Sequence, residues 1–291
     1  MYAITGITGQ VGGALGSALL DQGLPVRAVV RDPGKGALWA ARGCEVALAD
    51  MNDASALTTA FAGAEAVFIL PPSEFDPAPG YTQARETIDA IVAALVAARP
   101  ERILCLSTIG ADAVQDNLLT QRTLIEQVLG ALPIPVTFLR AGWFIENALW
   151  DVASARDEGV IHSFLMPLDK PIAMVATKDI GALAAELIQE DWIGNRIVEL
   201  EGPRRVSPND LAAAFAKALG RPVRAEIVPR DSWEAMFRGQ GATNPYPRIR
   251  MLDGFNEGWI DFSGDSETLR KGSIDEGTVI AELVERDGLV K

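Results

Sequence analysis

The chain has 291 residues and a formal charge of −13, from 26 lysines and arginines against 39 aspartates and glutamates. This length allows one large domain or two closely packed ones, and 48% hydrophobic residues is typical of a folded globular chain. The acidic balance argues against nucleic acid as a direct partner, because such binding depends on cations that neutralise phosphates. No apolar run is long enough to cross a bilayer, and no leader-like segment precedes the first predicted strand. With Cys44 and Cys105 interpreted as buried thiols, we expect a cytoplasmic protein.

Strand-like apolar runs alternate with helical segments through the first two-thirds of the chain. The predicted strands are Tyr2–Thr5, Val26–Val30, Glu45–Ala49, Ala66–Leu70, Ile103–Ser107 and Val136–Leu139. Their nearly continuous hydrophobicity is typical of parallel strands that are covered on both faces. Between them, apolar residues recur at helical spacing, and Asp53 is placed to cap a helix. The alternation predicts an α/β fold with a Rossmann-like, doubly wound parallel sheet.

The pattern loosens after Arg140. Further predicted elements are a strand near Ile172–Val175, a helix from Asp179 to about Glu190, a strand at Arg196–Leu200 and a helix from Ser207 to Gly220. We therefore predict a dinucleotide-binding domain over residues 1–155, completed by about residues 170–200. Residues 201–291, which are rich in aromatic residues, glycine and proline towards their end, are predicted to form a smaller α+β substrate part.

Three glycines recur at every third position where the first predicted strand ends, in Gly6-Ile7-Thr8-Gly9-Gln10-Val11-Gly12. Glycine allows a tight turn and lets backbone N–H groups and a helix N-terminus approach a diphosphate closely. The preceding strand and the following amphipathic helix distinguish this segment from an ordinary glycine-rich turn. The residues expected to bind the diphosphate of a dinucleotide are Gly6, Thr8, Gly9, Gln10, Val11 and Gly12.

The glycine spacing, in the segment from Ala3 to Gly12, resembles that of the atypical, or extended, short-chain dehydrogenases. Within that group the chain is most similar to the NmrA-like branch, which includes NADPH-dependent bacterial quinone oxidoreductases. The resemblance covers recognisable motifs from Tyr2 to about Leu200 and is vaguer beyond.

The second predicted strand ends at Arg31, 19 residues beyond Gly12, where dinucleotide-binding folds place the group that contacts the adenosine ribose. A guanidinium there can bind a 2′-phosphate through two hydrogen bonds, and Lys35 adds a second positive charge. The family's V-R-x-P-x-K pattern is present. Two alternatives remain: Arg31 is a solvated charge, or Asp32 accepts from the ribose hydroxyl and favours NAD. We predict NADPH/NADP⁺ as the cofactor.

By resemblance, Asp50 and Met51 lie beside the adenine, the alternative being a strand-end polar residue followed by a core methionine. Leu70 and Pro71 lie where the backbone would pass the ribose and nicotinamide, and Ser107 belongs to the pair that often precedes the catalytic residues of the family.

The Tyr-x-x-x-Lys pair of ordinary short-chain dehydrogenases is missing. Aligning Glu126 with the family's glutamate places Leu118 at the tyrosine position and Arg122 at the lysine position. Leucine cannot donate a proton, so ordinary ketone reduction and sugar epimerisation are not expected. Arg122 is predicted to hold the nicotinamide ribose or to stabilise an oxyanion, with a surface ion pair to Glu126 as the alternative. Tyr81 is expected on an ordinary helix face.

The segment Leu139–Asn147 resembles the family's L-R-x-G-W-x-x-E-N motif, which passes the nicotinamide and lines the acceptor pocket. Trp143 and Phe144 would offer flat surfaces to an aromatic acceptor and Asn147 would orient a carbonyl; the alternative is that both aromatics belong to the core. The lone histidine, His162, is interpreted as structural more readily than as a proton donor. No grouping of Cys and His suggests a metal site.

The leading hypothesis is an NADPH-dependent, flavin-free oxidoreductase that transfers hydride to quinone-like or other conjugated, electron-poor acceptors, azo compounds included. The alternative is an NmrA-type regulatory protein that senses NADP(H) without turnover and acts through a protein partner. The partner predicted for the enzyme is a small aromatic or quinone molecule. The sequence leaves a homodimer open.

Overall fold

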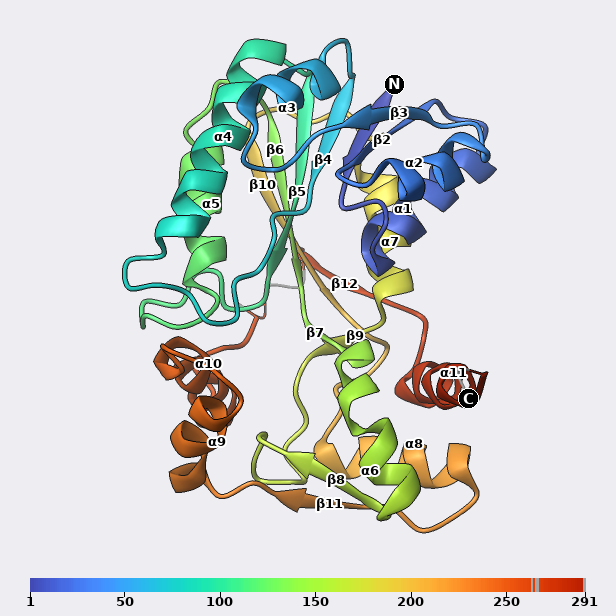
Figure 1. Ribbon diagram of the computed structural model, residues 1–291, viewed down its shortest axis with the longest axis vertical. Coiled ribbons are helices and arrows are strands. Elements are labelled where there is room, and N and C mark those ends of the chain that lie inside the picture. Colours follow the sequence, from blue (N-terminus) through green and yellow to red (C-terminus); the bar gives the residue numbers. More distant parts are fainter. Residues whose placement is uncertain (263, 265–266, 290–291) are drawn as a thin grey trace.

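A computed structural model describes residues 1–262, 264 and 267–289. Its centre is an eight-stranded sheet with the order β12-β10-β6-β5-β4-β1-β2-β3 (Figure 1). The strands are β1 (Tyr2–Thr5), β2 (Val26–Val30), β3 (Glu45–Leu48), β4 (Ala66–Ile69), β5 (Arg102–Thr108), β6 (Val136–Ala141), β10 (Asn195–Glu201) and β12 (Leu269–Lys271). All neighbouring pairs run parallel. The predicted doubly wound α/β fold is confirmed, and the order reverses between β1 and β4, the point where such folds bind ligands.

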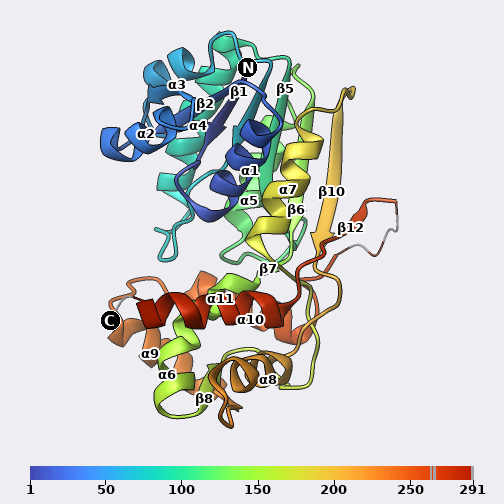
Figure 2. The same ribbon diagram turned by 90° about the vertical axis from the view of Figure 1, so that its right-hand side faces the viewer.

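Helices cover both faces of the sheet (Figures 1 and 2). One face carries α1 (Gln10–Asp21), α2 (Pro33–Ala40) and α7 (Thr177–Leu187), and the other carries α3 (Ala54–Phe61), α4 (Thr82–Ala98) and α5 (Thr120–Leu129). A separate apolar cluster lies under each layer. Because both faces are covered, strands such as β4 and β6 are buried along their whole length, which explains their continuous apolar sequence.

Local signals set several helix ends. Asp53 caps α3 by accepting from the amide of Ala56 at 2.9 Å, as predicted. Ser207 and Asp210 form a reciprocal capping box at the start of α8 (Pro208–Leu219), and Gly220 ends that helix in the left-handed conformation. The predicted extents of these elements agree with the structure to within a few residues.

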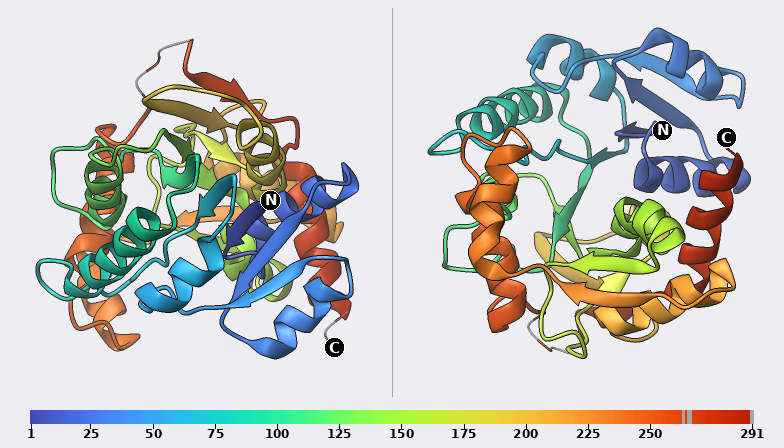
Figure 3. Two further views of the ribbon diagram at one scale, coloured as in Figure 1. Left: turned by 90° about the horizontal axis from the view of Figure 1, so that it is seen from above. Right: turned by 60° about the horizontal axis from the view of Figure 1, so that its bottom comes forward.

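A smaller part lies beyond the carboxyl ends of the strands (Figures 1 and 3). It contains β7 (Trp143–Phe144), η1 (Ile145–Asp151), α6 (Val152–Asp157), β8 (Val160–Ser163), β9 (Met174–Val175), α8, β11 (Arg224–Ile227), η2 (Arg230–Ser232), α9 (Trp233–Gly239), α10 (Tyr246–Glu257) and α11 (Glu276–Leu289). Two short parallel pairs, β8 with β11 and β7 with β9, accompany the helices. The chain crosses between the two parts several times, because β10 and β12 return to the large sheet.

Aromatic residues form much of the core of the smaller part. Phe164 stacks on Phe237 with 5.3 Å between ring centroids and meets Trp233 edge-on at 5.6 Å. Trp233 is fully buried, and its indole N–H donates to the carbonyl of Val228 at 2.9 Å. The aromatic content of residues 201–291 is therefore used to pack this part against itself.

Both cysteines, Cys44 and Cys105, are free and buried, as predicted. Burial raises the pKa of each thiol, that of Cys105 to about 12. Among the residues that the structure describes, no helix combines the length and apolar character needed to cross a bilayer.

Candidate functional site

The glycine-rich turn joins β1 to α1. Gly6 adopts a positive φ of 65°, and a Cβ there would lie 2.6 Å from Cδ2 of Leu70. A Cβ on Gly12 would lie 2.4 Å from the carbonyl oxygen of Gly6. Both positions therefore require glycine, one for its conformation and one for the close approach of two backbone segments. The turn is a tight cradle at the start of a helix.

The first turn of α1 carries no capping side chain: Gly9 is the N-cap. The N–H groups of such a turn are free to bind an anion, towards which the helix dipole also points. Gln10 is held at this point, because its side-chain amide lies 3.0 Å from the hydroxyl of Thr177. The same hydroxyl donates to Glu146, so the glutamate of the Leu139–Asn147 motif joins α7 to the start of α1.

Arg31 lies at the end of β2 with 77% of its side chain exposed, and its guanidinium is 3.9 Å from the Asp50 carboxylate. The neighbouring Asp32 caps α2, with its Oδ1 accepting from the amide of Gly34 at 2.8 Å. Lys35 is exposed in the first turn of α2. The structure therefore gives Asp32 a helix-capping role and leaves the exposed Arg31 guanidinium with only the long contact to Asp50, an arrangement that fits the predicted contact with a phosphate.

One cavity of about 1260 Å³ runs from this turn to the smaller part. It is larger than the 300–1,000 Å³ common for pockets that hold a single small ligand. The predicted site residues that line it are Gly6, Thr8, Gly9, Arg31, Asp50, Met51, Leu70, Pro71, Ser107, Arg122, Trp143, Phe144 and Asn147. Gln10, Val11, Gly12 and Lys35 do not line it; Val11 and Gly12 are buried beneath the turn.

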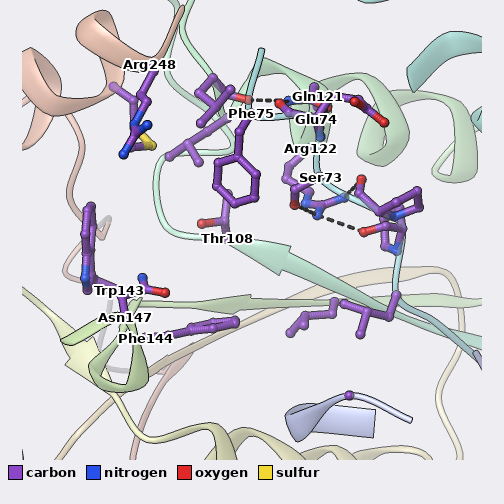
Figure 4. Close-up of a pocket in the computed structure, with 18 of the residues that line it drawn as sticks. Ser73, Glu74, Phe75, Thr108, Gln121, Arg122, Trp143, Phe144, Asn147 and Arg248 are labelled. Carbon is purple, nitrogen blue, oxygen red and sulfur yellow. Dashed lines mark hydrogen bonds between the residues drawn. The ribbon is translucent and has the colours of Figure 1, made fainter. Parts of the chain in front are cut away.

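Arg122 projects from α5 into this cavity (Figure 4). Its guanidinium donates to the Pro71 carbonyl at 2.9 Å and to the Ser73 hydroxyl at 2.6 Å. Burial lowers its pKa from the usual arginine value. No carboxylate of the described residues forms an ion pair with it, so the predicted alternative of a surface pair with Glu126 is wrong. Arg122 ties the loop after β4 to α5 and keeps its positive charge uncompensated.

Glu126 has other partners. It accepts from the hydroxyl of Ser107 and, through both oxygens, from Arg140 at 3.0 and 2.7 Å. Arg140 also donates to Asp112 at 2.9 Å. This group joins the ends of β5 and β6 to α5 directly below the cavity, and it positions Ser107 on the cavity wall.

The Arg140→Met variant is expected to be about 3 kcal/mol less stable to unfolding, because it leaves the 11%-exposed side chain of Glu126 without its buried cation. Urea unfolding monitored by circular dichroism measures this loss. The control is Arg238→Met, which removes an exposed pair with Glu234 and should cost about 1 kcal/mol or less. Equal losses in the two variants would contradict this assignment.

The residues of the Leu139–Asn147 motif approach the cavity from β7 and η1. Trp143 and Phe144 are half-buried, with one side against apolar clusters and the other on the cavity wall. Trp143 meets Phe255 edge-on at 5.3 Å between centroids. Asn147 is exposed in the cavity. The core alternative therefore holds in part, because these rings pack against apolar clusters, while their contact with an acceptor stays a prediction.

No tyrosine lines the cavity within the described ranges of the chain, whereas Leu118 does. The expectation for Tyr81 is wrong: it precedes α4 with a positive φ of 60°, is buried, and donates its hydroxyl to Asp116 at 2.6 Å. Its pKa is raised, chiefly by burial. The positive φ and the distant acidic partner are not visible in the residue spacing.

Several lining residues were missed by the sequence analysis. Phe75, 65% exposed, projects into the cavity from the loop after β4, and Arg248 points into it from α10 (Figure 4). Asp151 also lines it. Thr108, the second residue of the pair that begins with Ser107, lines it too, and so does His162, which is exposed although the sequence favours a structural role for it. Phe75, Asp151 and Arg248 belong to no motif, and Arg248 is far along the chain from the glycine turn, so no local pattern marks it.

The Asp151 carboxyl has its pKa raised to about 6 by burial, an effect only partly offset by a hydrogen bond from the backbone of His162. Because the ordinary value is 3.8, ionisation of Asp151 should begin to destabilise the folded state as the pH rises above about 4, with the full cost reached above about 6. The Asp151→Asn variant should therefore be about 2 kcal/mol more stable than the parent near pH 8 and unchanged near pH 4. Melting curves at the two pH values test this, and a pH-independent difference would contradict it.

The sequence profile of the NmrA-like family matches residues 2–267. The chain is 30% identical to Quinone oxidoreductase 2 of Escherichia coli (strain K12), over 98% of this chain and 97% of that protein. It is 28% identical to the NAD(P)H azoreductase of Xenophilus azovorans, over 83% of this chain and 82% of that protein.

Among solved structures, the chain is similar to the NADPH-dependent quinone oxidoreductase of Escherichia coli complexed with NADPH. The TM-score is 0.79 at 27% sequence identity, and the alignment covers 99% of this chain and 100% of that one. The likeness extends over both the large sheet and the smaller part.

Proposed function

The chain belongs to the NmrA-like family, and we propose that it is an oxidoreductase that uses NADPH, without a flavin, to reduce quinone-like and other conjugated, electron-poor acceptors such as azo compounds. Its relatives include a quinone oxidoreductase and an azoreductase, and a similar structure holds NADPH. We place it in the cytoplasm, a reducing compartment in which the thiols of Cys44 and Cys105 stay unpaired.

The residues of the turn fit a dinucleotide. The turn contacts the start of α1 so closely that a Cβ on Gly12 would clash with it. The first turn of α1 has no capping side chain, which leaves its N–H groups available to a diphosphate. Arg31, with Asp32 occupied as a helix cap, would bind the 2′-phosphate. Asp50 and Met51 line the same end of the cavity and would hold the adenine.

The observation that carries the proposal is the single cavity lined both by this dinucleotide cradle and by Trp143, Phe144 and Asn147. A molecule bound against the aromatic residues would therefore share one continuous cleft with the cofactor. A binding protein that only senses a nucleotide needs no such second compartment, so the cavity favours an enzyme over the regulatory alternative.

NADPH, when bound, supplies a hydride from C4 of its nicotinamide, which together with one proton from water converts a quinone to a hydroquinone and leaves NADP⁺. In this chain Trp143, Phe144 and Phe75 would orient a flat acceptor and displace water from around it. Arg122 would stabilise negative charge that develops on the acceptor oxygen. Since Leu118 cannot donate a proton, acceptors whose reduced anions are stable should react best.

The test is to mix the purified protein with NADPH and a panel of quinones and azo compounds, and to follow the loss of absorbance of the reduced nicotinamide. Turnover without added flavin is the expected result. Tight binding of NADPH with no turnover of any acceptor would contradict the proposal and support the regulatory alternative, whose next test is capture of a protein partner.

A further inference from the structure

Arg248 lines the cavity from α10, a helix that lies far along the chain from the glycine turn. It projects from α10 into the space that Trp143 and Phe255 also line (Figure 4). Its guanidinium stacks over the ring of Phe237, 4.2 Å from the ring centroid. That stacking fixes one face of the planar group and leaves its N–H edge free to donate.

No carboxylate among the residues that the structure describes compensates the charge of Arg248. In the described part of the chain no carboxylate lies within ion-pair distance of it, and its guanidinium makes no hydrogen bond. The cavity also contains acidic residues, namely Asp50, Glu74, Glu86 and Asp151, but none of them pairs with it. Burial lowers the pKa of Arg248, with no neighbouring carboxylate to counter the effect.

The arginines near Arg248, in contrast, have an acidic partner. Arg230 and Arg250 share the carboxylate of Asp253, at 2.6 and 3.4 Å. Arg250 lies on the same helix, two residues from Arg248, and does not line the cavity. In a chain with 39 acidic residues, a partly buried guanidinium without a partner is costly to maintain, which indicates that a bound anion completes the site.

Arg248 belongs to α10 in the smaller part, whereas the residues proposed to hold the phosphates of the cofactor belong to the β1–α1 turn and to the end of β2 in the large sheet (Figure 1). It shares its end of the cavity with the aromatic residues proposed to hold the acceptor. An anion bound by Arg248 would therefore belong to the acceptor and not to the nucleotide.

We propose that Arg248 is a specificity-determining residue that selects acceptors carrying an anionic group, a sulfonate, carboxylate or phosphate, attached to the conjugated ring system. This rests on the proposed function and adds to it the substrate class. The stacked guanidinium can bind such a group through two parallel hydrogen bonds while the ring lies against Trp143 and Phe144.

The first experiment compares a naphthoquinone with the same naphthoquinone carrying one ring sulfonate, under NADPH oxidation by the parent, Arg248→Gln, Arg248→Lys and Arg250→Gln proteins. Arg248→Gln should raise KM for the sulfonated quinone about tenfold or more, since a hydrogen bond to a charged group is lost, and should change kcat/KM for the neutral quinone by about twofold or less. Arg248→Lys should retain part of the preference. Arg250→Gln, which removes the same charge outside the cavity, should leave the preference intact.

The second experiment measures binding without turnover, by calorimetry with naphthalene sulfonate and naphthalene sulfonamide, with and without NADP⁺. The parent should prefer the sulfonate, and Arg248→Gln should not. An equal effect of Arg248→Gln on charged and neutral ligands would overturn the inference and assign Arg248 a purely structural role against Phe237. Loss of the preference in Arg250→Gln would overturn it as well, because a long-range charge effect would then suffice. If the parent reduces neither quinone, the proposed function fails, whereas the binding comparison still decides the role of Arg248.

Discussion

Replacing Gly12 with alanine is expected to lower the affinity for NADPH at least about a hundredfold and to destabilise the protein by about 2–3 kcal/mol. The new Cβ would lie 2.4 Å from the carbonyl oxygen and 2.6 Å from the carbonyl carbon of Gly6, and 2.9 Å from Cα of Ile7. All three are backbone atoms, so no side chain can move aside to relieve the contact. The turn must then shift away from α1, and the N–H groups of the cradle lose their common direction.

The matched control is Gly13→Ala, one residue further along the same helix. Its Cβ would lie 3.3 Å from the carbonyl oxygen of Ile7, a contact that a shift of a few tenths of an ångström relieves. Fluorescence titration with NADPH and thermal unfolding of both variants separate binding from stability. A Gly12→Ala protein with parental affinity and melting temperature would show that the turn is not the binding cradle.

Replacing Arg31 with alanine is expected to weaken NADPH binding about 10- to 100-fold, the range for loss of charge-assisted hydrogen bonds to a phosphate. The affinity for NADH should stay within about twofold of the parental value, because that nucleotide lacks the 2′-phosphate. Arg31 is largely exposed and its contact with Asp50 is long, at 3.9 Å, so its removal disturbs little else. The two affinities are measured by titration of nicotinamide fluorescence.

Arg42→Ala is the control for overall charge. Arg42 lies near the same edge of the sheet, where it stacks on Trp39 and donates to Ser17 without lining the cavity. It should leave the preference for NADPH unchanged. If Arg31→Ala lowered both affinities equally, its contribution would be general electrostatic attraction and the assignment of the 2′-phosphate site would be wrong.

The elements that could be predicted from sequence are those whose signals are local. The strands β1 and β2 were predicted with their observed bounds because both are short, apolar and followed by a turn. The cap at Asp53 and the helix beginning after Ser207 also depend on neighbouring residues only. The same holds for the glycine turn, whose requirement for glycine arises within seven residues of chain.

What could not be predicted depends on contacts between distant segments. Spacing along α5 suggested a pair between Arg122 and Glu126, yet Glu126 is taken by Arg140 from β6, and Arg122 turns to the loop that carries Pro71 and Ser73. Arg248 reaches the cavity only because α10 packs across its far end. Asp32 is the reverse case, because its role as the cap of α2 follows from the local sequence, although the same residue at the end of β2 also suggests a ribose ligand.

The most direct test of the account is a calorimetric titration of the parent protein with NADPH and, separately, with NADH. Saturable binding of NADPH, about tenfold or more tighter than that of NADH, is the predicted result, since Arg31 would contact a phosphate that only NADPH carries. No heat with either nucleotide, or equal affinity for both, would contradict the claim that the β1–α1 turn and the end of β2 form an NADPH site.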